Sequence, residues 1–229
     1  MILFRLIIIF FPSIFLTLNS NFFIFSMNFL CTFFLFISLF FSLDAQSAYF
    51  DHWSEDQIQI ANNASDLDYL TLEEKKVFLI LNLARISPKL FQQHILQSYQ
   101  VPEGFLDDCL VNNRYINSLS KALLTMDPIS PLTPDKELWQ HAKCHAIKSG
   151  KRGYVGHKRV GCPKPDPYSE CCSYGFEKAI DIVVQLLIDY QIRDLGHRKI
   201  MLDAKQKLLG VSIQPHKNYV YNAVLDFSY

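Results

Sequence analysis

Two histidines and one glutamate are the side chains best suited to chemistry in this 229-residue chain. His157 follows Gly156 in a glycine-containing stretch, His197 follows Gly196 at a predicted helix start, and Glu170 lies between them. Glycine lets the backbone approach a ligand, and irregular segments commonly carry binding sites. The three residues are therefore the candidate site, although their spacing alone does not show that they meet.

A second histidine pair, His141 and His145, lies at positions i and i+4 of a predicted helix. Such a pair shares one helix face and could chelate a metal ion. The zinc-peptidase motif needs a glutamate directly after the first histidine, and Ala142 stands there instead. We expect His145 to pack in a helix interface and His141 to be a partly exposed neighbour.

Five cysteines lie beyond residue 46, at positions 109, 144, 162, 171 and 172. Disulfides are the expected use of cysteine in an exported protein, and the absence of paired C-x-x-C spacing disfavours a structural zinc site made of cysteines. A disulfide between the adjacent Cys171 and Cys172 would be strained. We expect Cys162 to pair with Cys171 or Cys172 and so to pin the loop between them. A cysteine nucleophile would need a partner such as histidine, and none lies nearby in the sequence.

Residues 1–46 form a hydrophobic leader with one basic residue, one acidic residue and 13 of the 19 phenylalanines. Its second apolar run, 29–43, has about 14 apolar residues, which is closer to a signal-peptide core than to a membrane span of about 20. Small residues follow between Ala45 and Ala48, where cleavage is expected. We therefore predict a signal peptide, with Met27 as the suspected true start, and secretion or a periplasmic location. The alternative is an uncleaved leader that anchors the protein in the membrane.

The remaining chain contains predicted helices first and a β-hairpin last, preceded by a polar lead-in at 47–69. Thr71 and Glu74 form a capping box before an amphipathic helix, and further helices are predicted at about 134–149, 176–192 and 196–201. Residues 119–124 are a short helix at best, and 151–173 show little periodicity. Two strands, 209–214 and 219–227, are spaced for a hairpin. This order predicts an α+β fold.

Taken together, several segments between 70 and 229 resemble the CAP superfamily of cysteine-rich secretory, antigen 5 and pathogenesis-related proteins. The helix 79–85 resembles the family's opening Asn-x-x-Arg helix, and 129–138 with Ala142 and Ala146 resembles its Pro-Leu block. Gly156-His157 stands at the place of the first cleft histidine. Residues 195–202, followed by 209–212, are close to the bacterial Gly-His-Arg block. The eukaryotic Gly-His-Tyr-Thr-Gln block is absent, which favours the bacterial-type branch.

The resemblance implies a three-layer α–β–α sandwich with a small antiparallel sheet. It also implies that His157 and His197 face each other across a cleft, with Glu170 orienting one of them. In that arrangement the two neutral imidazoles would suit Zn²⁺ or a similar divalent ion, and a carboxylate on the second ring nitrogen would fix the tautomer. Ser169 and Cys171 replace the glycine and asparagine that flank this glutamate in the family, so its assignment rests on position. The second acidic residue of the cleft would be Asp189, and a one-residue shift would put Tyr190 there.

Three functions of different class follow from these expectations. The leading one is an exported, monomeric binding protein whose cleft holds a lipid-like or peptide ligand. The alternatives are a metal-assisted hydrolase that uses the same cleft and a structural or interaction module of the cell envelope. Because the formal net charge is zero, no long-range field would attract nucleic acid.

Overall fold

The computed structural model describes residues 50–102 and 114–229, so the predicted leader and Cys109 lie outside the described residues. The described part has an α+β architecture with a four-stranded mixed sheet, which confirms the α+β prediction. None of its helices is long and apolar enough to cross a lipid bilayer.

The first described helices begin with side-chain caps. Helix α2 (Glu55–Ala61) lies within the stretch taken as a lead-in and starts at a capping box formed by Ser54. Helix α3 (Leu72–Ile86) starts at Thr71, whose hydroxyl accepts from the Glu74 N–H, and the Glu74 side chain accepts from the Thr71 N–H. This reciprocal pair confirms the predicted capping box.

Shorter helical segments continue the chain after α3. Helix α4 (Pro88–Leu90) runs into a π-helical turn, η1 (Phe91–Leu96). Helix α5 (Arg114–Thr125) is longer than the short segment predicted. The reason is an apolar stripe of three buried residues spaced four apart, Tyr115, Leu119 and Leu123. Tertiary burial of that stripe stabilises a helix that the sequence pattern only suggested.

The sheet has the strand order β1–β3–β4–β2. Strands β3 (Leu208–His216) and β4 (Val220–Ser228) form the predicted hairpin, and β2 (Ser169–Tyr174) pairs with the outer side of β4. The two-residue β1 (Thr133–Pro134) pairs in parallel with β3, so the sheet is mixed and not purely antiparallel as expected. Strand β2 falls in a segment that we expected to be irregular, because cysteine, serine and tyrosine there give no alternation of apolar and polar residues.

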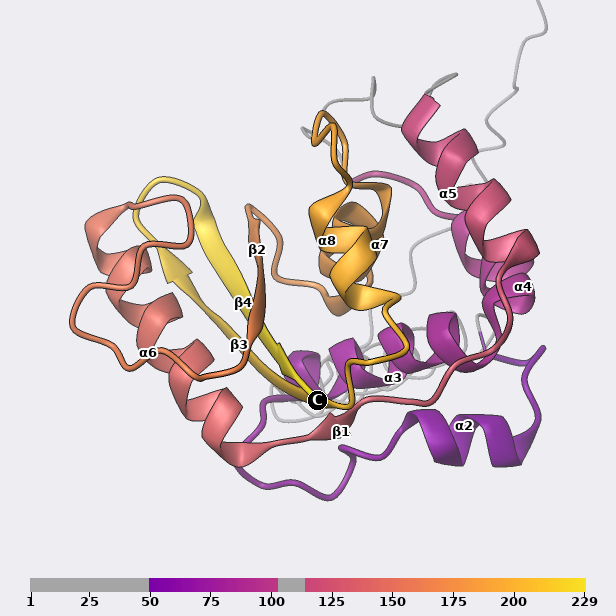
Figure 1. Cartoon of the computed structure of the whole chain (residues 1–229), viewed down its shortest axis with the longest axis horizontal. Helices are drawn as coiled ribbons and strands as arrows, with labels where there is room; N and C mark the ends of the chain where they lie inside the picture. The colour runs from indigo at the N-terminus through magenta and orange to yellow at the C-terminus, as the bar shows by residue number, and fades with distance from the viewer. Residues whose placement is uncertain (1–49, 103–113) are drawn as a thin grey trace, which may run out of the picture. The chain divides into compact units, whose positions relative to one another are not determined.

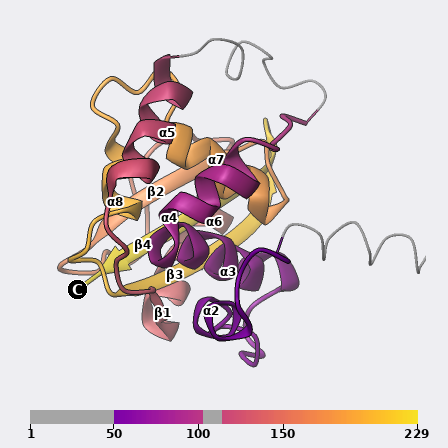
Figure 2. The ribbon, with the colours of Figure 1, turned by 90° about the vertical axis from the view of Figure 1, so that its right-hand side faces the viewer.

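Helices cover both faces of the sheet, with α6 (Lys136–Arg152) on one face and α3, α7 (Ala179–Ile188) and α8 (Gly196–Met201) on the other (Figure 1). Figure 2 shows the same elements after a 90° turn. Helix α6 packs very closely on β3, since a Cβ on Gly210 would come within 2.1 Å of the Trp139 backbone nitrogen. Only glycine permits this approach.

Two helices have bounds that differ from the predictions. Helix α6 begins after Asp135, whose side chain accepts from the Leu138 N–H, and it passes Gly150 to end at Gly153 in a left-handed conformation. Helix α7 is shorter than the predicted 176–192, and its side chains are buried on nearly all sides. The residue that ends α7, Asp189, leads directly into the candidate site.

Candidate functional site

His157 lies in the loop after α6 and is held by Glu170 on β2. Its Nδ1 atom is 2.9 Å from Glu170 Oε1, and the imidazole is 56% exposed while the carboxylate is only 3% exposed. The hydrogen bond to Glu170 raises the pKa of His157, and burial opposes this effect. The carboxylate therefore fixes Nδ1 as the protonated nitrogen and directs the other ring nitrogen away from itself.

His197 lies in the first turn of α8 and is held in the same way by Asp189. Its Nδ1 atom is 2.7 Å from Asp189 Oδ1, and the backbone N–H groups of His197 and Arg198 donate to Oδ2 of the same carboxylate. Asp189 has a φ of 57°, a left-handed conformation that short polar side chains tolerate. This turn at the end of α7 brings the carboxylate under the start of α8.

The structure brings the two histidines together. Their ring centroids are 6.3 Å apart, although 40 residues separate them in the sequence. In the described part of the chain, no hydrogen bond engages Nε2 of either ring. Each Nδ1 is paired with a buried carboxylate, so each Nε2 has its lone pair available for a ligand.

The buried residue Arg198 fixes the helix that carries His197. Its guanidinium donates to the main-chain oxygens of Leu187, Ile188 and Tyr115 and to the Ser118 hydroxyl. These bonds tie α8 to α7 and α5. The position of His197 therefore depends on packing with elements far away in the sequence.

Arg159 and Asp226 form a buried charged network behind Glu170. The Arg159 guanidinium contacts Glu170 Oε2 and lies 2.6 Å from Asp226 Oδ2, while Glu170 and Asp226 are paired residues of β2 and β4. Burial raises the pKa of Asp226 to about 7, against the lowering effect of Arg159. Burial also favours the neutral form of Glu170, but the hydrogen bond from His157 and the charge of Arg159 outweigh it and lower the pKa of Glu170. Glu170 is thus kept ionised and fixed in orientation.

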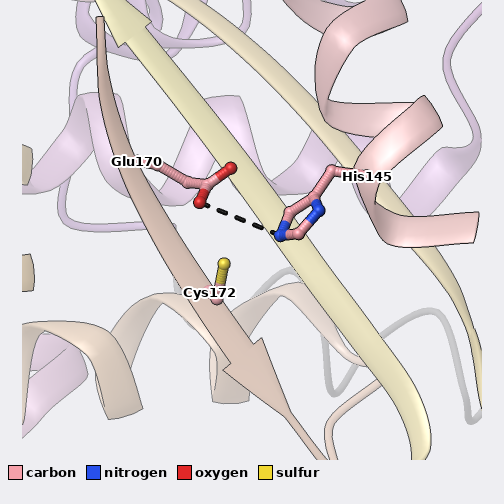
Figure 3. Close-up of side chains that lie close together, drawn as sticks. All are labelled: His145, Glu170 and Cys172. Atoms are coloured by element: carbon pink, nitrogen blue, oxygen red, sulfur yellow. Dashed lines mark ion pairs between the residues drawn. The ribbon is translucent and has the colours of Figure 1, made fainter. Parts of the chain in front are cut away.

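A second group of potential ligands lies behind the histidine pair. His145 of α6 and Glu170 and Cys172 of β2 are all buried, and their ligand atoms lie within 4.8 Å of one another (Figure 3). The structure thus confirms that His145 packs in an interface, and it adds that this group could hold a metal ion. Burial lowers the pKa of His145, and burial together with the charge of Glu170 raises the pKa of the Cys172 thiol.

An open hollow of about 330 Å³ also borders His145. Its lining contains three cations, Lys148, Arg152 and Lys158, with Tyr154 and Val160, and no acidic side chain. In the described residues, neither Arg152 nor Lys158 has a salt-bridge partner. The hollow suits an acidic group attached to an apolar body.

The disulfide prediction was wrong. Cys162 pairs with Cys144 of α6, while Cys171 and Cys172 are free and buried. Cys171 and Cys172 point to opposite faces of β2, where side chains alternate, and neither reaches the loop that carries Cys162. The Cys144–Cys162 bond ties that loop to α6, close to His157.

His157, Glu170 and His197 were candidates from the sequence, and the family resemblance added Asp189, with Tyr190 as the alternative. The structure brings His157, Glu170, His197 and Asp189 together. Sequence reasoning missed Arg159, Asp226 and the grouping of His145 with Cys172. Asp226 did carry a signal, because an acidic residue inside the apolar strand 223–227 must be buried with a partner. Arg159 carried none, since it lies in a loop without periodicity.

Comparison of the chain with protein-family models gives no match, and comparisons with curated proteins and with solved structures give none either.

Proposed function

We propose that this chain is an exported binding protein of the CAP superfamily, with a three-layer α–β–α sandwich whose cleft binds a divalent metal ion between His157 and His197. The observation that carries the proposal is the matched arrangement of the two imidazoles, each held at Nδ1 by a buried carboxylate and 6.3 Å from the other between ring centroids. A surface histidine without a ligand does not require a buried carboxylate to orient its ring, so the two matched pairs support a ligand-binding role.

The donor set fits Zn²⁺ or a similar divalent ion. His157 and His197 would hold the ion through Nε2, and Glu170 and Asp189 would keep both rings in the tautomer that leaves Nε2 unprotonated. A metal bound there would supply a positive charge and exchangeable positions for water or a ligand group. The exposed fraction of the His157 side chain, 56%, leaves the cleft open to such a ligand.

The ligand in this proposal is lipid-like or a peptide, and the cationic hollow beside His145 favours one with an acidic group. Its lining combines the cations Lys148, Arg152 and Lys158 with the apolar surfaces of Tyr154 and Val160. We propose that the protein acts as a monomer outside the cytoplasm and does not bind nucleic acid. The support for export is the hydrophobic leader together with the Cys144–Cys162 disulfide.

Metal-assisted hydrolysis is less well supported by this geometry. A general base must reach a water molecule or a substrate. Glu170 is already engaged by His157 and Arg159, Asp189 is engaged by His197 and two backbone N–H groups, and both carboxylates are almost fully buried. Binding needs only the exposed Nε2 atoms and is the function that the arrangement supports best.

The proposal is tested by calorimetric Zn²⁺ titration of the wild type and of the His157→Ala/His197→Ala double variant. The matched control is His52→Ala/His94→Ala, because these two rings stack 3.5 Å apart and have no carboxylate partner in the described residues. We expect the first double variant to lose binding at the cleft and the control to keep it. Equal zinc binding by the wild type and the His157→Ala/His197→Ala variant would refute the metal cleft.

A further inference from the structure

A buried thiol, a buried imidazole and a buried carboxylate converge behind the histidine cleft. Glu170 and Cys172 are two residues apart on β2 and so share one face of the strand, which faces His145 on α6 (Figure 3). Cys172 is in no disulfide, and its sulfur lies 3.8 Å from Nδ1 of His157. The proposed cleft uses neither His145 nor Cys172.

The distances between the ligand atoms of this group are close to those between the ligands of a bound metal ion. Zinc lies about 2.0–2.3 Å from nitrogen, oxygen and sulfur ligands, which puts neighbouring ligand atoms of a tetrahedron about 3.3–3.7 Å apart. His145 Nε2 is 3.9 Å from Glu170 Oε1, and all three ligand atoms lie within 4.8 Å. An inward movement of these side chains by about 1 Å would bring the three ligand atoms to the spacing of a zinc tetrahedron. The Gly156 carbonyl oxygen, 3.1 Å from His145 Nε2, is positioned to be the fourth ligand.

The chemistry of the three side chains selects the kind of ion. A thiolate with an imidazole is typical of Zn²⁺ and disfavours Mg²⁺ and Ca²⁺, which prefer oxygen ligands. A thiolate and a carboxylate together carry two negative charges, which balance one divalent ion in a buried site. Arg159 contacts Glu170 Oε2, while Oε1 accepts from His157 Nδ1 and also lies 3.9 Å from His145 Nε2. A carboxylate oxygen has two lone pairs, so Oε1 can bind the ion through the second one and still orient His157.

We propose that His145, Glu170 and Cys172 form a buried, thiolate-containing zinc site, separate from the His157–His197 cleft. On binding, the Cys172 thiol releases its proton to solvent, and the His145 ring proton moves from Nε2, where it faces Gly156, to Nδ1. The site would join α6 to β2 and hold Glu170, the residue that orients His157. It does not depend on metal binding in the cleft.

Cobalt replaces zinc in such sites and reports its ligands, because only a thiolate ligand produces an intense near-ultraviolet sulfur-to-cobalt charge-transfer band. The full-length chain, purified in mild detergent, is titrated with Co²⁺ under reducing conditions that preserve the Cys144–Cys162 bond. The test variant is Cys172→Ser, and the matched control is Cys171→Ser, a buried thiol next to it on the opposite face of β2. His197→Ala removes the cleft without touching the inner group.

We expect the wild type, Cys171→Ser and His197→Ala to show the band, and Cys172→Ser to lose it with a drop in zinc affinity of more than about 100-fold, since even an outer residue of a metal site contributes 10–100-fold. Loss of the band in His197→Ala but not in Cys172→Ser would show that the thiolate ligand is not Cys172 and depends on the cleft, and would overturn the inner site. A band that survives in Cys172→Ser would also overturn it.

A measurement on the wild type keeps the test decisive if Cys172→Ser does not fold. X-ray absorption of the zinc-loaded protein must show a sulfur neighbour at about 2.3 Å together with nitrogen and oxygen neighbours. A zinc spectrum with no sulfur neighbour overturns the buried site but leaves the cleft intact. Failure of the cleft is recognised separately, by unchanged zinc binding in the His157→Ala/His197→Ala variant.

Discussion

Replacement of Asp189 by asparagine tests how the cleft depends on its buried carboxylates. Asp189 accepts three hydrogen bonds, two from backbone N–H groups at the start of α8 and one from Nδ1 of His197 at 2.7 Å. In Asp189→Asn, the amide oxygen can keep the backbone bonds, but the amide NH₂ then faces the Nδ1–H of His197. Two donors cannot bond, so the ring moves its proton to Nε2 or rotates away. Either response removes the lone pair that binds the metal.

The size of the effect follows from the bond that is lost. A hydrogen bond to a charged group contributes about 1.5–3 kcal/mol. Because about 1.4 kcal/mol corresponds to a tenfold change in affinity, we expect zinc binding at the cleft to weaken about 10- to 150-fold. Calorimetric titration at pH 7.5 measures this change, and circular dichroism checks that the variant is folded.

The matched control is Asp194→Asn, which removes an exposed carboxylate from the loop just before α8 and engages no histidine in the described residues. It should bind zinc as the wild type does. If Asp189→Asn is folded and binds zinc within twofold of the wild type, the carboxylate does not set the tautomer of His197, and the reasoning is refuted.

Three further predictions concern stability. Arg85 is fully buried and donates four hydrogen bonds to main-chain oxygens. Because each oxygen left without a donor costs about 1–3 kcal/mol, Arg85→Met should lower the free energy of unfolding, measured by urea titration, by at least about 3 kcal/mol. A loss below about 1 kcal/mol would contradict this. Cys144→Ser opens a disulfide with a sequence separation of 18 and should cost about 3 kcal/mol, with reductant destabilising the wild type and not the variant. Burial raises the pKa of Asp226 to about 7 from an ordinary 3.8, so the folded state holds its proton more tightly than the unfolded chain. The stability contributed by the protonated Asp226 carboxyl is therefore lost as pH rises from about 4 to about 7. The thermal midpoint of Asp226→Asn should rise relative to that of the wild type over this pH range. A difference between the two midpoints that does not change with pH would argue against a raised pKa for Asp226.

Much of the candidate site was predictable because its residues stand at recognisable local features. His197 follows a glycine at the start of a helix, and His157 follows a glycine in a loop after one. The α3 capping box and the β3–β4 hairpin are local as well, since their signals lie within a few residues of each other. The boundaries were less predictable, because Gly150 lies inside α6 where its missing side chain makes room for the Pro215 carbonyl of β3.

The sequence alone indicated helices α3, α6 and α7, the hairpin, the hydrophobic leader and the histidines that could bind a metal, because periodicity, caps and residue chemistry are properties of short segments. Only the tertiary structure decided which of these side chains meet. Arg159 reaches Asp226 across 67 residues, and Cys144 reaches Cys162 and not the free cysteines of β2. These contacts depend on the register of β2 against β4 and on the packing of α6 against the sheet. Neither leaves a local pattern, since burial and pairing arise from segments that are far apart in the chain.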